Sequence, residues 1–103
     1  MNQFSVVGRV LRSPTVEETG NGTKIAHLII EAEKEVKGKD GFTTETFEIT
    51  CFKNLAEYSS NLRIGDLIGI SGFLSANNYK KSDGVIYYTP QLLANKIVAI
   101  TKY

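Results

Sequence analysis

The chemistry available to this chain of 103 residues comes from one out-of-phase aromatic residue and from lysines in loops. In the segment 42–52, apolar and polar residues alternate as on a strand, and Phe52 falls on the polar face. A ring in that position needs a ligand, a partner or a neighbouring strand to cover it. The lysines beside it or in two turn-rich segments are Lys53, Lys34, Lys37, Lys39, Lys80 and Lys81. Because rings stack on bases and ammonium groups neutralise phosphates, such residues favour binding of single-stranded nucleic acid.

The overall charge gives this interpretation no extra support. Lys and Arg number 12 and Asp and Glu number 11, so the formal net charge is +1. Any binding surface must therefore arise from local arrangement. Glu33, Glu35 and Asp40 interleave with the first lysine group, so solvated loop lysines remain an alternative interpretation.

His27 and Cys51 are the residues that suggest catalysis or metal binding. One histidine and one cysteine cannot supply a structural zinc site, which leaves a Cys–His nucleophile pair as the catalytic option. Cys51 shares the apolar face of its strand with Phe47 and Ile49, which predicts a buried, inert thiol. No phosphate-binding loop is found, and no cofactor is expected. A small enzyme that uses Cys51 stays open as an alternative.

Alternating apolar residues and turn signals predict five strands. Their ranges are 4–11, 24–36, 42–52, 67–74 and 85–100. Ser13-Pro14 is expected to end the first strand, and Pro90 is expected at an edge or a bulge of the last. Within 67–74, Gly69 and Gly72 lie three positions apart, which suits a strand that curls into a small barrel.

One short helix is predicted over 54–62. Its apolar stripe consists of Leu55, Tyr58 and Leu62. Asn54 is expected to cap the first turn, with Glu57 completing a capping box, and Gly65 is expected to end the helix. The order of three strands, a helix and two strands is typical of a five-stranded Greek-key barrel of the oligonucleotide-binding (OB) type. We expect this all-β OB-fold to form a single domain over 1–103, with the helix plugging one end.

Several short motifs occur in order along nearly the whole chain. They are Val6-Val7-Gly8-Arg9-Val10, Arg12-Ser13-Pro14, Asn21-Gly22-Thr23-Lys24-Ile25-Ala26, Phe52-Lys53-Asn54-Leu55-Ala56-Glu57, Gly65-Asp66-Leu67-Ile68-Gly69-Ile70-Ser71-Gly72-Phe73-Leu74, Asp83-Gly84 and Tyr88-Thr89. Each is weak alone, but the ordered set resembles the bacterial single-stranded DNA-binding protein family. The resemblance implies an OB barrel that binds single strands with little sequence preference and assembles as a homotetramer.

The resemblance also implies roles for individual residues. Phe52 and Tyr79 match stacking aromatics of the family, whereas Val36 and Thr46 stand where the family has two more. Family positions for basic contacts are neutral or acidic at Glu48, Asn54 and Ile64. Two further aromatics, Phe73 and Tyr87, either extend the stacking platform or seal a subunit interface, and the interface is preferred.

These observations predict a non-catalytic single-stranded DNA-binding protein that acts in replication, recombination or repair. We expect a homo-oligomer, a tetramer or a dimer, with replication or repair proteins as further candidate partners. From the end at Thr101-Lys102-Tyr103 we expect no acidic, Pro-Phe-ended tail of the kind through which family members recruit other proteins. An adaptor like the primosomal replication-restart relative, acting through protein contacts, is therefore the alternative. Without a signal peptide or an apolar run of about 18 residues, a cytoplasmic protein with no membrane contact is expected.

Overall fold

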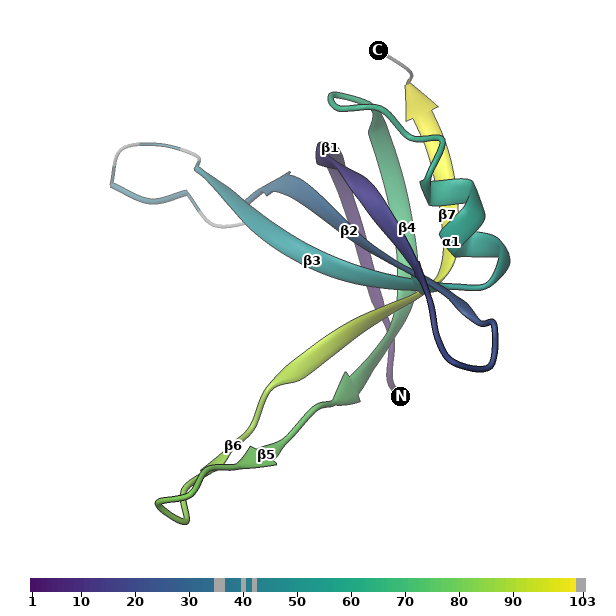
Figure 1. Ribbon diagram of the computed structural model, residues 1–103. Helices are drawn as coiled ribbons and strands as arrows, with labels where there is room; N and C mark the ends of the chain where they lie inside the picture. Colours follow the sequence, from purple (N-terminus) through teal and green to yellow (C-terminus); the bar gives the residue numbers. More distant parts are fainter. Residues whose placement is uncertain (35–36, 40, 42, 102–103) are drawn as a thin grey trace.

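Five strands close into a barrel, and a two-stranded hairpin projects from it (Figure 1). The computed structural model describes residues 1–34, 37–39, 41 and 43–101. Its elements are β1 (Phe4–Glu18), β2 (Lys24–Glu33), β3 (Thr44–Phe52), α1 (Asn54–Ser59), β4 (Leu67–Ala76), β5 (Tyr79–Lys80), β6 (Ile86–Tyr87) and β7 (Pro90–Thr101). The barrel order is β1-β2-β3-β7-β4, and β5 pairs with β6 separately. The predicted all-β OB barrel with a short helix between its third and fourth strands is confirmed.

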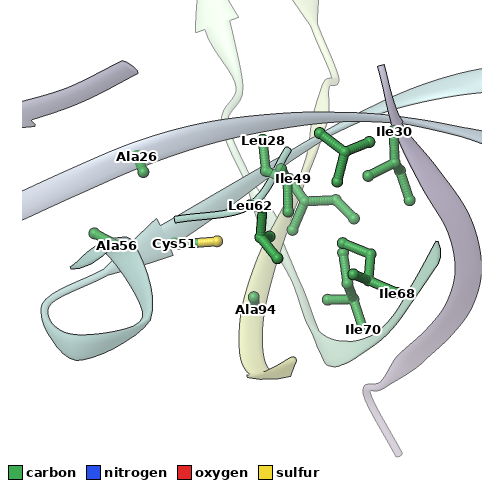
Figure 2. Packing of buried hydrophobic residues seen from close by; sticks show 11 residues of the cluster. Ala26, Leu28, Ile30, Ile49, Cys51, Ala56, Leu62, Ile68, Ile70 and Ala94 are labelled. Carbon is green, nitrogen blue, oxygen red and sulfur yellow. The ribbon is translucent and has the colours of Figure 1, made fainter. Parts of the chain in front are cut away.

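The core is built from residues that alternate along each barrel strand and point inward. Leu28 and Ile30 of β2 and Ile49 and Cys51 of β3 are completely buried. Figure 2 shows these side chains gathered with Ile68 and others between the strands. Since the β2–β3 pairing is regular from Ile25↔Phe52 to Glu33↔Thr44, every second residue of both strands keeps its face. The outward position of Phe52 follows directly from this register.

The first strand is longer than predicted. β1 continues through Ser13-Pro14 to Glu18, so the expectation that this dipeptide ends the strand was wrong. The β1–β2 pairing shifts register between Val10 and Arg12 and again between Arg12 and Thr15. Proline lacks a backbone N–H, and such an irregular stretch tolerates it because the regular ladder is interrupted there.

The helix is shorter than predicted and begins differently. It covers Asn54–Ser59, and Lys53 is the N-terminal cap residue, with φ of 55° and no side-chain capping bond. The prediction that Asn54 caps the helix was therefore wrong, and Glu57 pairs with Lys24 instead. Gly65 does not end the helix either, because α1 stops six residues before it. The helix packs against β1, β2, β3 and β7, and its residue Ala56 belongs to the core.

The predicted last strand is two strands. The segment 85–100 divides into β6 and β7 at Tyr88 and Thr89, and β7 begins with Pro90. The Asn77 backbone N–H donates to the Thr89 carbonyl oxygen at 2.8 Å, so the hairpin remains joined to the barrel at its base. The second strand is also shorter than predicted and ends at Glu33, while Val36 lies outside the described residues.

Gly72 of β4 is required by close packing. A Cβ atom at this position would lie 1.9 Å from the Leu93 carbonyl oxygen and 2.7 Å from Cε2 of Phe4. The β4–β7 pairing shifts register beside it, between Ser71 and Gly72. Gly69 differs, because a Cβ atom there would make only ordinary contacts, the nearest at 3.7 Å. Of the two glycines, Gly72 is the one that fits the predicted role in curving the strand.

Candidate nucleic-acid interface

Phe52 ends β3 on the outer face of the barrel, beside the start of α1. It pairs with Ile25 of β2, and its side chain is 37% exposed. The chain then turns at Lys53, whose positive φ and N–H bond to the Lys24 carbonyl oxygen at 2.8 Å redirect it into α1. The ring is thus held by a paired strand while one part of it faces solvent.

A second exposed ring, Phe73, lies on the same outer face. The pairings His27↔Thr50, Thr50↔Leu93 and Leu93↔Phe73 form one row across β2, β3, β7 and β4. Phe52 lies two residues further along β3 than Thr50, so it shares the outward direction of this row. Phe73 is 41% exposed. The barrel surface therefore carries two rings that its core does not use.

The charges around Phe52 are partly neutralised. Lys24 makes a hydrogen-bonded ion pair with Glu57 of α1. The hydrogen bond is the larger cause, and the negative charge of Glu57 the second, of a raised pKa of Lys24. On the same outer face, His27 Nδ1 lies 3.1 Å from Glu48 Oε1, although the angle between the groups is not that of a hydrogen bond. Because Lys24 is paired with Glu57, a phosphate contact beside the ring would depend on Lys53.

Tyr79 lies on the β5–β6 hairpin, opposite Tyr87. Their ring centroids are 5.3 Å apart and the ring planes differ by 10°, which is a stacked geometry. Tyr79 is 48% exposed. A turn at 82–84 closes the hairpin, with Gly84 at φ of 87° and the Asp83 carboxylate accepting the Val85 N–H at 2.9 Å.

Lys80 and Lys81 lie on opposite faces of this hairpin. Alternation along the strand places Lys81 with Tyr79 and Tyr87, whereas Lys80 pairs with Ile86 on the reverse face. The Lys81 Nζ atom lies 4.8 Å from the centroid of the Tyr87 ring, within the range of a cation–π contact. The two lysines that the sequence grouped together therefore have different surroundings.

The remaining predicted lysines belong to the turn between β2 and β3. Lys34, Lys37 and Lys39 are all exposed, and the Lys34 N–H donates to the Thr43 carbonyl oxygen at 2.8 Å. Lys34 also lines an open groove of about 890 Å³, together with Glu33 and Glu45. Of the acidic residues that the sequence indicated, Glu33 lies in this groove, and Glu35 and Asp40 lie outside the described residues.

The structure places the eight predicted residues in three groups. Phe52 and Lys53 lie at the end of β3, Tyr79, Lys80 and Lys81 lie on the β5–β6 hairpin, and the other lysines lie on the β2–β3 turn. The two hairpins project toward the same side of the barrel in Figure 1 but diverge from each other. Phe52 and the Tyr79–Tyr87 pair therefore lie on different elements, the barrel strand β3 and the projecting hairpin.

The geometry excludes a Cys51–His27 pair. Cys51 is completely buried in the barrel, whereas His27 faces outward in the neighbouring position of β2. Burial raises the pKa of the Cys51 thiol to about 11, which disfavours the nucleophilic thiolate. Within the described residues, no three His, Cys, Asp or Glu side chains are grouped closely enough to hold a metal ion. The predicted burial of Cys51 is confirmed.

Sequence reasoning preferred a subunit-interface role for Tyr87 and did not connect it with Tyr79. In the structure it contacts both Tyr79 and Lys81. The signal was available, since Tyr79 and Tyr87 lie four positions before and four after Asp83 in the hairpin turn. Residues at equal distances from a hairpin turn become cross-strand neighbours.

Comparisons with known proteins identify the family of this chain. The model of the single-strand binding protein family matches residues 1–100, so this chain belongs to that family. "Single-stranded DNA-binding protein B" of Bacillus subtilis is 26% identical over 98 residues, covering 93% of this chain and 87% of the relative. A Bacillus cereus single-stranded DNA-binding protein is 30% identical over 100 residues, covering 94% of this chain and 58% of the relative. The "Single-stranded DNA-binding protein 1" of Staphylococcus aureus strain Mu50 is 28% identical over 99 residues, covering 94% and 64%.

The chain thus spans most of the Bacillus subtilis relative but less than two thirds of the other two. Among the described residues, no helix has the length and apolar character needed to cross a membrane.

Proposed function

We propose that this protein binds single-stranded DNA with little sequence preference, by base stacking and phosphate neutralisation. The observation that carries the proposal is the exposure of Phe52 and Tyr79 on the barrel and hairpin of a single-strand binding family member. The relatives are named for single-stranded DNA binding, which favours this interpretation over the primosomal adaptor. The proposal includes a role in replication, recombination or repair, in the cytoplasm.

Stacking is the main source of affinity in this proposal. A base stacked on an aromatic ring contributes about 1–3 kcal/mol, and every base offers a π-face, so the contact is tolerant of sequence. The formal net charge of +1 gives little long-range attraction. Phosphate contacts therefore come from local cations, with Lys53 next to Phe52 in the chain and Lys81 on the same hairpin face as Tyr79.

The two rings are far enough apart to be contacted by different nucleotides of one strand. Phe52 ends the barrel strand β3, whereas Tyr79 lies on the hairpin that projects from the barrel. OB folds bind sites of about 4–16 nucleotides, and a strand of that length has bases for both rings. The proposed path continues along the same side of the barrel to the β2–β3 turn, which carries Lys34, Lys37 and Lys39.

A homo-oligomer, either a tetramer or a dimer, is part of the proposal. The pairings Val7↔Gly69 and Gly69↔Val98 form an outward-facing apolar row across β1, β4 and β7. Val7 and Val98 are 55% and 48% exposed, and Ile100 extends the same apolar surface. An exposed apolar patch of this kind is typical of a protein interface, and contacts with replication or repair proteins are proposed in addition.

The test is a fluorescence titration with oligo-dT at two salt concentrations. We expect binding that weakens between about 50 and 200 mM salt with a shallow slope, because few phosphates are neutralised. Light scattering with and without the oligonucleotide measures the subunit number at the same time. No binding of oligo-dT at low salt, or equal binding of duplex DNA, would overturn the proposal. A monomer that binds oligo-dT would overturn only the homo-oligomer.

A further inference from the structure

The β5–β6 hairpin holds a group of three side chains that its backbone alone does not fix. Tyr79 and Tyr87 stack at a centroid separation of 5.3 Å, and the Lys81 Nζ atom lies 4.8 Å from the Tyr87 centroid. The backbone ladder of this hairpin has only two residue pairs, and β5 and β6 make their main contacts with each other. The barrel core therefore contributes little to the orientation of the Tyr79 ring.

Tyr87 is the residue that limits the freedom of Tyr79. A half-exposed tyrosine on a short ladder samples several rotamers, and a base that stacks on it must select one of them. A parallel ring directly across the ladder restricts that choice before the base arrives. The Lys81 ammonium group over Tyr87 restrains the second ring in turn.

We infer that Tyr87 is a positioning residue for base stacking, which holds Tyr79 in the orientation that receives a base and is itself held by Lys81. The inference rests on the proposed function, since it assigns a role within single-strand binding. It moves Tyr87 from the expected subunit interface to the nucleic-acid surface. In this role Tyr87 acts through Tyr79, so its contribution disappears when Tyr79 is absent.

A double-mutant cycle in oligo-dT binding tests this dependence. Tyr79→Leu is expected to weaken binding about tenfold or more, as for loss of a stacking ring. Tyr87→Leu is expected to weaken it about two- to tenfold, the range for one side chain that must now be ordered on binding. The double variant should match Tyr79→Leu, and Tyr87→Phe, which keeps the ring, should restore wild-type affinity. Tyr88→Leu is the matched control, because Tyr88 is 75% exposed and outside the stack.

Two further measurements separate positioning from folding and from direct contact. An abasic oligonucleotide of the same length keeps the phosphates but offers no base, so Tyr87→Leu should leave its affinity unchanged. Near-ultraviolet circular dichroism of the DNA-free protein should lose the same signal in Tyr79→Leu, in Tyr87→Leu and in the double variant.

The possible failures are distinguishable. If the wild-type protein does not bind oligo-dT, the proposed function fails and the inference fails with it. If it binds but Tyr87→Leu has wild-type affinity, or if the losses in the two single variants multiply in the double variant, only the inference is overturned. Independent dichroism changes in the two single variants would also overturn it, because they would mean that the rings do not interact.

Discussion

The barrel at Gly72 and the hairpin at Tyr79 are seven residues apart in one chain, yet different forces shape them. At Gly72 the backbone of β7 comes so close that a single methyl group would overlap the Leu93 carbonyl oxygen. At Tyr79 the backbone ladder has two residue pairs, and a ring stack with Tyr87 supplies the order. The first region has no space for a side chain, and the second consists mostly of exposed side chains.

The contrast between the two regions indicates that different residues determine stability and DNA binding. Buried, interlocked positions set the free energy of unfolding, because packing there tolerates almost no change in volume. Exposed rings contribute little to that free energy and remain available for a ligand. Substitution of a buried residue is therefore expected to unfold the protein, and substitution of an exposed ring is expected to weaken DNA binding.

The largest expected effect is that of Gly72→Ala on stability. The added methyl group overlaps backbone atoms of Leu93, which cannot move without breaking the β4–β7 pairing. We expect a loss of about 3 kcal/mol or more in the free energy of unfolding, measured by chemical denaturation. Gly20→Ala is the control, since a Cβ atom there meets nothing within 4 Å. Equal stability of the two variants would mean that β4 and β7 do not approach as described.

The exposed aromatics should show the opposite pattern. Phe52→Ala and Tyr79→Ala are each expected to weaken oligo-dT binding by about 1–3 kcal/mol. Tyr79→Ala should leave the free energy of unfolding within about 0.5 kcal/mol of wild type, because its ring lies outside the core. Fluorescence anisotropy and denaturation on the same samples check both. A Tyr79→Ala variant that binds normally but unfolds easily would reverse the contrast.

The pH dependence of the free energy of unfolding tests whether the Cys51 thiol is buried in the barrel. Burial raises its pKa from 9.0 to about 11, so the folded state holds the thiol proton more tightly than the unfolded chain. The contribution of the protonated thiol to the free energy of unfolding is fully present below pH 9.0 and is lost as the pH rises through 11. Between neutral pH and about pH 10, the free energy of unfolding should fall by about 1 kcal/mol more in the wild-type protein than in Cys51→Ala. Identical pH profiles would show that the thiol is not buried.

The smallest expected effect distinguishes the two faces of the hairpin. Lys81 shares a face with the stacked tyrosines, and Lys80 lies on the reverse face. Lys81→Gln should reduce the slope of log K against log salt by about 0.7, the value for one single-strand phosphate contact. Lys80→Gln should reduce it by less. A larger effect at Lys80 would place the strand on the reverse face of the hairpin.

The sequence predicted best those elements whose side chains alternate strictly between core and solvent. In β3 the period of two assigned the faces correctly, including the burial of Cys51 and the outward position of Phe52. A strand with one buried face has a single favourable register, so the pattern of apolar residues carries the structural information. The barrel and the position of its helix follow from the order of such elements.

Features set by long-range packing were predicted less well. Pro14 lies within β1 because the pairing with β2 is irregular there. The sequence around Pro14 does not indicate where two distant strands will pair irregularly. The helix start at Lys53 depends on its N–H bond to Lys24 of another strand. The contact of Tyr79 with Tyr87 needed the register of a two-pair ladder, which only the turn at Asp83 could have indicated.

The most direct test of the central claim is a competition binding assay between oligo-dT and a duplex of equal length. The assay compares the wild-type protein with the double variant Phe52→Ala/Tyr79→Ala. The claim is that exposed rings, rather than net charge, hold unpaired DNA on this nearly neutral protein. We predict that wild type prefers oligo-dT and that the double variant, still folded, loses this preference while retaining weak, salt-sensitive binding to both. A double variant that keeps the full preference for oligo-dT would contradict the account.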